Sequence, residues 1–132
     1  MTFELEIATP DRLLVCEQVE EAEIPLANGY IGVLPGHAPL LGEIGTDALT
    51  YLAGGRRRQM AVSGGWAEVL GDHVRVLTNS AEKADEIDVA RAEESHKRAL
   101  DRLSRPPADL DVARAMNALR RAQARMDAVA KK

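Results

Sequence analysis

The sequence predicts a two-part protein, in which an N-terminal antiparallel β-sandwich or flattened barrel is followed by a C-terminal αα-hairpin of two helices. Three observations predict this class. Apolar and polar residues alternate through about Ala84, turn residues separate the alternating runs, and a helical spacing begins afterwards. We therefore divide the chain into residues 1–84 and residues 85–132. The length of 132 residues suits one ordinary domain with an appendage.

The N-terminal part has the period of two that half-buried strands show. In "FELEIATP", which begins at Phe3, apolar residues alternate with glutamates, and "HVRVLT" from His73 alternates in the same way. Dipeptides such as Asn28-Gly29 and Gly54-Gly55 separate these runs and are typical of hairpin turns. Many short strands with such turns indicate an antiparallel sandwich or barrel.

The C-terminal part contains no glycine and is rich in alanine and arginine. We expect Asp85 to cap a first helix, Pro106 and Pro107 to end it, and Asp109 to cap a second. The second helix carries an apolar stripe at helical spacing, made of Leu110, Ala113, Met116, Leu119, Ala122, Met126 and Val129. Because this part of the chain is rich in alanine and other strong helix formers, and a buried methyl contributes little, each helix can persist while it packs weakly. The pattern alone leaves open whether the hairpin opens or stays docked on the sandwich.

Charge and hydropathy exclude several classes of protein. The net charge of −4 divides into −6 for residues 1–84 and +2 for residues 85–132, which is too weak a basic character for a nucleic-acid-binding face. No apolar run approaches the roughly 20 residues that span a bilayer. We expect a soluble cytoplasmic protein, or one peripheral to a membrane through a partner. Cys16 follows an apolar run and is expected to be buried and inert.

Catalytic chemistry has few candidates in this chain. The histidines are His37, His73 and His96, and they form no cluster at metal-ligand spacing with the single cysteine. Ser63 lies in "VSGGW", which lacks the form of a nucleophile elbow. We therefore interpret His37 as a hydrogen-bonding residue of a Pro35-Gly36 turn and expect neither enzymatic activity nor a bound metal.

Two stretches carry a family resemblance. "GYIGVLPGHAPLLGEIG" and "AVSGGWAEVLGDHVRVLTNSAEKADEIDVARA" resemble the epsilon subunits of bacterial and chloroplast F-type ATP synthases, and the resemblance covers essentially the whole chain. It implies a non-catalytic subunit of the central stalk. The sandwich would bind the gamma subunit and the c-subunit ring, and the helical tail would extend into the alpha/beta catalytic head and restrain ATP hydrolysis. It also implies a peripheral location on the cytoplasmic face of the cell inner membrane.

The resemblance assigns two sets of contact residues. The expected rotor interface comprises Tyr30, Gly32, Leu34, His37, Leu40 and Leu41. Tyr30 stands where relatives often carry an acidic residue, so a contact based on charge is in doubt there, and a core role for Tyr30 is equally open. The expected contacts with the catalytic head are Arg114, Arg120, Arg121 and Arg125. Contacts of arginine with acidic surfaces weaken with salt.

A second motif concerns nucleotide binding. The stretch "IDVARA", from Ile87 to Ala92, resembles the motif by which some epsilon subunits bind ATP on the folded-down tail. A helix would put Asp88 and Arg91 on one face, where the carboxylate suits an adenine amino group and the guanidinium suits phosphate. The remaining polar contacts would come from Glu82, Arg98, Arg121 and Arg125. No cofactor is required, and ATP is a regulatory ligand in this interpretation. The alternative is that Asp88 serves the helix dipole and Arg91 a surface ion pair.

Two other functions remain open at this stage. The first is a stand-alone module that binds a small ligand beneath a lid formed by the helices. The second is a small hydrolase that uses His37. Association with a gamma subunit would separate the rotor function from the first, and turnover by the isolated chain would support the second.

Overall fold

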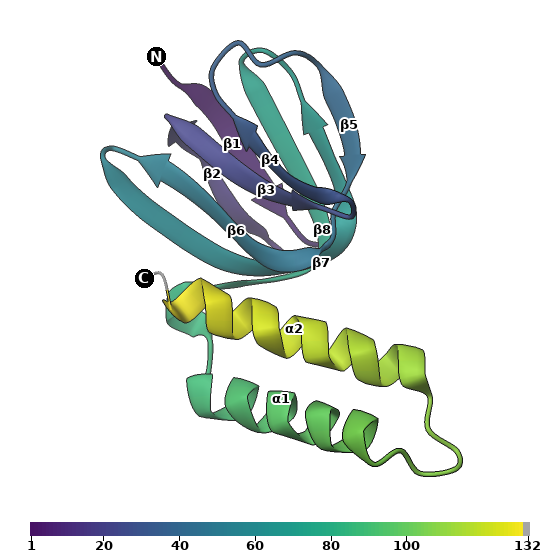
Figure 1. Cartoon of the computed structure of the whole chain (residues 1–132). Coiled ribbons are helices and arrows are strands. Elements are labelled where there is room, and N and C mark those ends of the chain that lie inside the picture. The colour runs from purple at the N-terminus through teal and green to yellow at the C-terminus, as the bar shows by residue number, and fades with distance from the viewer. Residues whose placement is uncertain (131–132) are drawn as a thin grey trace.

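The computed structural model describes residues 1–130 of the chain, and these form a β-sandwich with a two-helix hairpin beneath it (Figure 1). The strands are β1 (Phe3–Ala8), β2 (Leu13–Val19), β3 (Glu21–Leu26), β4 (Gly29–Val33), β5 (Leu40–Glu43), β6 (Thr46–Ala53), β7 (Arg56–Val69) and β8 (His73–Lys83). A 3-10 turn, η1 (Ala84–Glu86), leads to α1 (Val89–Ser104) and α2 (Val112–Ala130). The predicted fold class is confirmed.

The strands follow the order β2-β1-β8-β7-β6-β3-β4, and β5 pairs with β7. Neighbouring strands among the described residues are antiparallel except β1 and β8, which run parallel. The prediction of an antiparallel sandwich did not include this pair. Alternation reports which face of a strand is buried, and it carries no information on which distant strand lies alongside.

The sandwich depends on a bend in its longest strand. The first part of β7 pairs with β6, whereas Trp66–Val69 pairs with β5, so β7 belongs to both layers. The bend lies at Gly64 and Gly65, which have φ of +71° and +102°. The buried hydroxyl of Thr78 on β8 donates to the Gly64 carbonyl oxygen at 2.7 Å. Glycine is the residue that adopts such φ values without steric cost.

The core fills the space between the layers with the alternating residues of each strand. Phe3, Leu5 and Ile7 are at most 1% exposed, as the alternation predicts. The expectation that Cys16 is buried is wrong, since its side chain is exposed. Cys16 lies opposite Glu6 in the β1–β2 register, so it shares the outward face of the sheet with that glutamate.

The helix caps differ from those expected. Asp88, not Asp85, caps α1, because its carboxylate accepts from the Arg91 backbone N–H at 3.1 Å while Asp85 lies in the 3-10 turn. Likewise, Asp111 and not Asp109 caps α2, since its carboxylate accepts from the Arg114 backbone N–H at 3.0 Å. The sequence offers several acids before each helix, and the cap is the one whose backbone is still extended where the helix begins.

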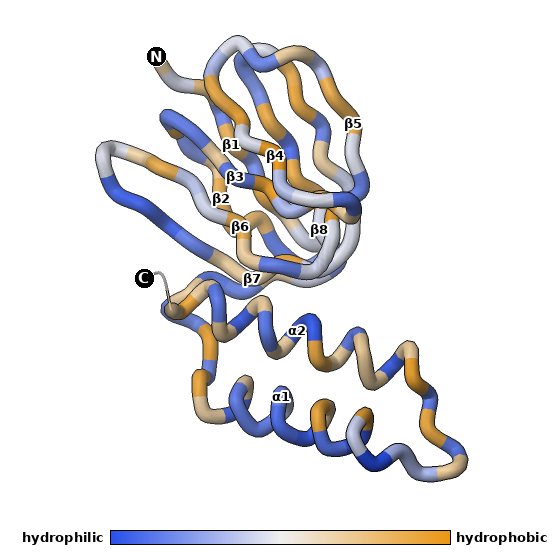
Figure 2. The backbone as a smooth tube through the Cα atoms, in the orientation of Figure 1, coloured by the Kyte–Doolittle hydropathy of each residue, from blue (hydrophilic) through white to orange (hydrophobic). Residues whose placement is uncertain are grey.

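Helix α2 packs on β6 and β7 through small residues. Ala124 and Ala128 of α2 meet Ala48 and Ala61 of the strands, and Ile87 of the linker completes this cluster. The buried residues of α2 are Ala115, Ala122, Ala124 and Ala128, so the expected apolar stripe is correct at Ala122 and wrong at Ala113, which is exposed. The hairpin is docked here, and α1 consists largely of hydrophilic residues (Figure 2). No helix within residues 1–130 is long and apolar enough to cross a membrane.

Candidate functional surfaces

The junction between sandwich and helices is closed by an ion pair. Arg125 on α2 donates from Nε to the Glu82 Oε1 at the end of β8, at 2.6 Å. About a third of each side chain is exposed. The cavity beside the pair, which Arg121 also lines, has a volume of about 10 Å³. That volume holds about one water molecule, so the docked helices enclose no space for a nucleotide there.

The residues of the expected ATP site are brought together only in part. Glu82, Arg121 and Arg125 line this one cavity. Ile87 is buried nearby against α2, whereas Asp88 and Arg91 lie at the start of α1. Asp88 precedes the helix as its N-cap, and its carboxylate accepts from the Arg91 backbone N–H, so its proposed contact with adenine stays a prediction.

The other two residues of the expected ATP site, Ala92 and Arg98, lie on α1. Ala92 is 2% exposed in the body of the hairpin. Arg98 is on the outer surface, where it contacts Ser95 at 3.0 Å and Glu94 at 3.9 Å. In this conformation Arg98 therefore serves pairs within its own helix, of the kind that contribute a few tenths of a kcal/mol.

A second ion pair anchors the linker to the sandwich. The guanidinium of Arg12 donates to both carboxylate oxygens of Glu86, at 2.9 and 3.0 Å. These hydrogen bonds, and one from the Lys83 backbone N–H, lower the pKa of Glu86 below its ordinary value. A lowered folded-state pKa means that the pair stabilises the fold above the unfolded pKa and loses that effect as pH falls through the folded one. Sequence analysis missed this pair because its members are 74 residues apart.

The loop around His37 is a tight turn held by its backbone. The Leu34 carbonyl accepts from the His37 N–H at 3.1 Å, and Gly36 has the positive φ of +83° that such a turn requires. The Gly36 N–H donates to Gly71, which ties the turn to the β7–β8 connection. The His37 Nδ1 lies 2.7 Å from the carbonyl oxygen of the neighbouring Ala38. The backbone of His37 thus closes the turn, and no carboxylate of the described residues pairs with its ring.

An apolar row crosses the outer face of the sheet. Leu13, Leu77 and Trp66 come from β2, β8 and β7, and they are 57%, 53% and 55% exposed. Ala8 connects Leu13 to Leu77 in the strand register, and Trp66 lies directly opposite Leu77. We call Leu13, Leu77 and Trp66 the apolar row. Exposed large apolar residues that gather on one face mark interaction surfaces. Those on β7 and β8 were missed because alternation alone does not distinguish an outer face from an inner one.

The six residues expected at the rotor interface do not form one surface. Leu41 is 68% exposed on β5, whose outer face adjoins the apolar row at Trp66, and Leu34 is 59% exposed at the turn. Leu40 packs against the core, and Gly32 is exposed on β4. Tyr30 lies at the helix junction instead.

Tyr30 contributes to the junction rather than to the core. Its hydroxyl donates to the Ala48 carbonyl at 2.9 Å, and Ala48 packs against α2. Half of the residue remains exposed. Partial burial is the main reason that the pKa of Tyr30 is raised, and the interaction with Asp47 is the second reason. Tyr30 and the Leu34–His37 turn are thus at opposite ends of β4, the turn being distant from the helices (Figure 1).

The four arginines expected to contact a catalytic head all lie on α2, in different surroundings. Arg121 and Arg125 face the closed junction. Arg120 lines an open space of about 560 Å³ that Tyr30 and Asp47 also border. Arg114 is exposed in the first turn. The docked hairpin therefore places Arg121 and Arg125 against the sandwich.

One further cluster was not apparent from sequence spacing. Glu4, Glu6 and His73 meet on β1 and β8, with His73 Nδ1 at 3.3 Å from Glu4 Oε1. The Arg75 guanidinium lies 3.6 Å from a Glu6 oxygen. This guanidinium already supplies positive charge to the acids, so the cluster is an ion-pair network on the outer face.

Comparisons with known proteins agree with this architecture. The family model "ATP synthase, Delta/Epsilon chain, beta-sandwich domain" matches residues 2–84, and "ATP synthase, Delta/Epsilon chain, long alpha-helix domain" matches residues 85–130. The class defined by the sandwich and hairpin is thus a two-domain subunit of ATP synthases. The chain belongs to the ATP synthase delta/epsilon chain family.

Individual relatives support the same assignment. An ATP synthase epsilon chain of Solibacter usitatus is 59% identical over 101 residues, covering 76% of this chain and 72% of the relative. Another of Koribacter versatilis is 50% identical over 102 residues, covering 77% and 72%. The predicted resemblance to epsilon subunits is confirmed.

Solved structures show the same arrangement. A chain of the Euglena gracilis mitochondrial ATP synthase, described as OSCP/F1/c-ring in rotational state 1, superposes with a TM-score of 0.83 at 25% identity, covering 96% of this chain and 80% of that one. A chain of the Tetrahymena thermophila mitochondrial ATP synthase central stalk and c-ring gives 0.57 at 13% identity, covering 98% and 92%. The second likeness shows the fold alone.

Proposed function

We propose that this chain is the non-catalytic epsilon subunit of the central stalk of an F-type ATP synthase. Its sandwich binds the gamma subunit and the c-subunit ring and connects their rotation to the alpha/beta catalytic head. It reaches the cytoplasmic face of the inner membrane only through these partners. Family membership favours this function over the stand-alone ligand-binding module and over the hydrolase.

The observation that carries the proposal is the apolar row on a rigid sheet. Two leucines in line with an exposed tryptophan suit permanent burial against another protein, since aromatic anchors dominate the binding energy of interfaces. Residues on paired strands are also held in more precise positions than residues on loops.

We expect the double substitution Trp66→Ser with Leu77→Ser to weaken binding of the gamma subunit by about 100-fold or more. Both side chains are more than half exposed, so the thermal stability of the isolated chain should change little. The measurement is the dissociation constant by calorimetry or surface plasmon resonance. Val112→Ser, which removes an equally exposed apolar side chain from α2, is the matched control. Equal affinity of the double variant and the parent would remove the apolar row from the interface.

We also propose that the helical hairpin restrains ATP hydrolysis when it leaves the sandwich. Its support is the docking surface, which is built from alanines whose burial contributes little per residue, while α2 carries the arginines that acidic surfaces would bind. Deletion of residues 87–132 should raise the rate of ATP hydrolysis by the assembled complex. The measurement is steady-state hydrolysis with ATP synthesis followed in parallel. An unchanged rate would contradict the restraint for this protein.

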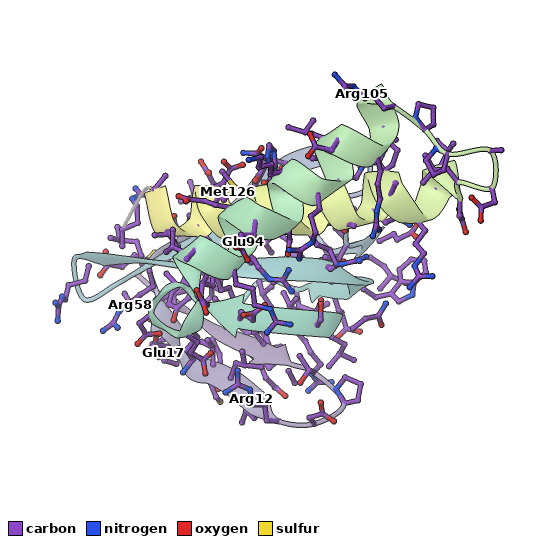
Figure 3. The ribbon with its side chains drawn as sticks, turned by 90° about the horizontal axis from the view of Figure 1, so that it is seen from below. Arg12, Glu17, Arg58, Glu94, Arg105 and Met126 are labelled. Atoms are coloured by element: carbon purple, nitrogen blue, oxygen red, sulfur yellow. The ribbon has the colours of Figure 1, made fainter. Side chains whose placement is uncertain are left out.

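ATP is the proposed regulatory ligand of the docked hairpin. Because the cavity at Glu82 and Arg125 is nearly closed, binding there requires these two side chains to separate and α2 to shift. We expect Arg91→Ala to weaken ATP binding to the isolated chain about tenfold, since a charge-assisted hydrogen bond to phosphate is lost. Arg105→Ala is the control, because Arg105 lies at the far end of the hairpin (Figure 3). Absence of heat on titrating the parent chain, or equal affinity of parent and Arg91→Ala, would exclude the site.

A further inference from the structure

One stretch of β7 continues beyond its neighbour as an open edge. Strand β8 ends at Lys83, which pairs with Met60, whereas β7 reaches back to Arg56 and pairs with β6 on its other side. No described strand pairs with Arg56–Arg58 on the side that β8 has left. A strand directs alternate N–H and C=O groups to each side, so this stretch of about 10 Å presents backbone donors and acceptors.

A groove accompanies this edge. It has a volume of about 390 Å³ and is lined by Tyr51, by Arg56–Met60 and by Lys83–Asp85. It therefore occupies the place in the sheet where β8 would lie if it continued. The β6–β7 hairpin that forms one wall projects beyond the rest of the sandwich (Figure 1). A two-residue turn at Gly54-Gly55, with φ of +57° and +75°, joins its arms and fixes the register of the edge.

The groove is strongly basic in an acidic domain. Three consecutive arginines and Lys83 line it, against the single carboxylate of Asp85. Arg57 pairs with Glu21 at 3.3 Å. Neither Arg56 nor Arg58 forms an ion pair with any residue between 1 and 130. The arm of β7 beyond β8 accordingly appears as a hydrophilic stretch (Figure 2).

We propose that this edge binds an extended acidic segment of a partner protein, which adds to β7 as a strand in the place that β8 leaves. The backbone of the segment would pair with Arg56–Arg58, and acidic residues at alternate positions would face Arg56 and Arg58, which share one face of the strand. A small anion would use the cations but not the open backbone. The outer strands β2 and β4 also have open edges, yet neither contains lysine or arginine. Charge therefore selects the β7 edge.

The test uses the full chain, labelled for NMR, and three short capped peptides. In the first, glutamate alternates with threonine, and in the second, lysine replaces glutamate. The third has the acidic sequence with alternate backbone nitrogens methylated, which removes hydrogen-bond donors and keeps the charge. Only the first peptide should shift the amide signals of Arg56–Arg58 and Lys83, and it should bind more weakly as salt rises. Equal binding of the methylated peptide would reduce the groove to an anion site and overturn strand addition, as would the absence of shifts with the first.

A pair of variants tests the role of the cations. We expect Arg56→Ser with Arg58→Ser to weaken binding of the acidic peptide about tenfold or more. Arg105→Ser should leave the affinity unchanged, because Arg105 lies at the C-terminal end of α1, distant from Arg58 (Figure 3). All three arginines are exposed, so thermal unfolding of both variants should match that of the parent. Equal affinity of the double variant and the parent would overturn the proposal.

Discussion

Alanine in place of Gly65 is expected to lower the free energy of unfolding of the sandwich by more than about 3 kcal/mol. Gly65 has φ of +102°, a conformation that alanine adopts only with strain. A Cβ there would overlap the Leu77 carbonyl oxygen and lie 2.7 Å from the Thr78 Cα. Both are backbone atoms of β8, so relief requires β7 and β8 to separate where the two layers meet. Urea denaturation followed by circular dichroism measures the loss.

Gly71→Ala is the matched control for this prediction. Gly71 has no positive φ, and an added Cβ would meet no atom within 4 Å. Its effect should be within about 0.5 kcal/mol of zero, as for other surface substitutions. Equal stability of the Gly65 and Gly71 variants would show that the bend does not depend on glycine.

The bend also links the fold to the apolar row. Trp66 follows the two glycines directly and pairs with Leu77 on β8, so the turn of the strand aims the tryptophan outward. A Gly65 variant that retained partial structure should therefore lose gamma binding as well as stability. The bend at Gly64 and Gly65 thus determines both the fold of the sandwich and the position of Trp66 in the apolar row.

The sequence predicted the elements of the fold better than their partners. Alternation identified Phe3, Leu5 and Ile7 as core, because burial on one face of a strand is recorded residue by residue. The parallel β1–β8 pair and the outward position of Cys16 depend on register between strands, which alternation does not specify. The caps of both helices were misplaced by two or three residues for a similar reason, since several acids competed for each position.

The candidate surfaces were predictable only where a motif carried them. Glu82 and Arg125 were predicted as site residues from the family pattern. They lie together in the structure, where they form an ion pair with each other. The Arg12–Glu86 pair had no signal, because residues that far apart are brought together by the fold alone. Tyr30 was expected with Leu34, yet β4 separates them along its length, because a motif in sequence does not fix which end of a strand faces which partner.

Aspartate in place of Ala128 is expected to release the hairpin while the sandwich stays folded. Ala128 is fully buried against Ala48, Ala61 and Ile87, where an unpaired carboxylate would cost about 3 kcal/mol or more. The helix can avoid that cost by leaving the strands, since its own backbone hydrogen bonds do not depend on docking. The docked population should fall by more than about 100-fold.

Hydrogen exchange separates release from unfolding. In the Ala128→Asp variant the core amides of β1 and β8 should stay protected, whereas the amides of β6 and β7 beneath α2 should exchange faster. Ala130→Asp adds the same charge at an exposed position of the same helical turn, so it controls for the helix dipole. Glu82→Gln, which leaves Arg125 without its carboxylate partner at a junction where about a third of each side chain is exposed, should produce a weaker form of the same change, of about fivefold. If Ala128→Asp and Ala130→Asp exchange alike, alanine packing does not hold the hairpin, and the ease of its release must have another origin.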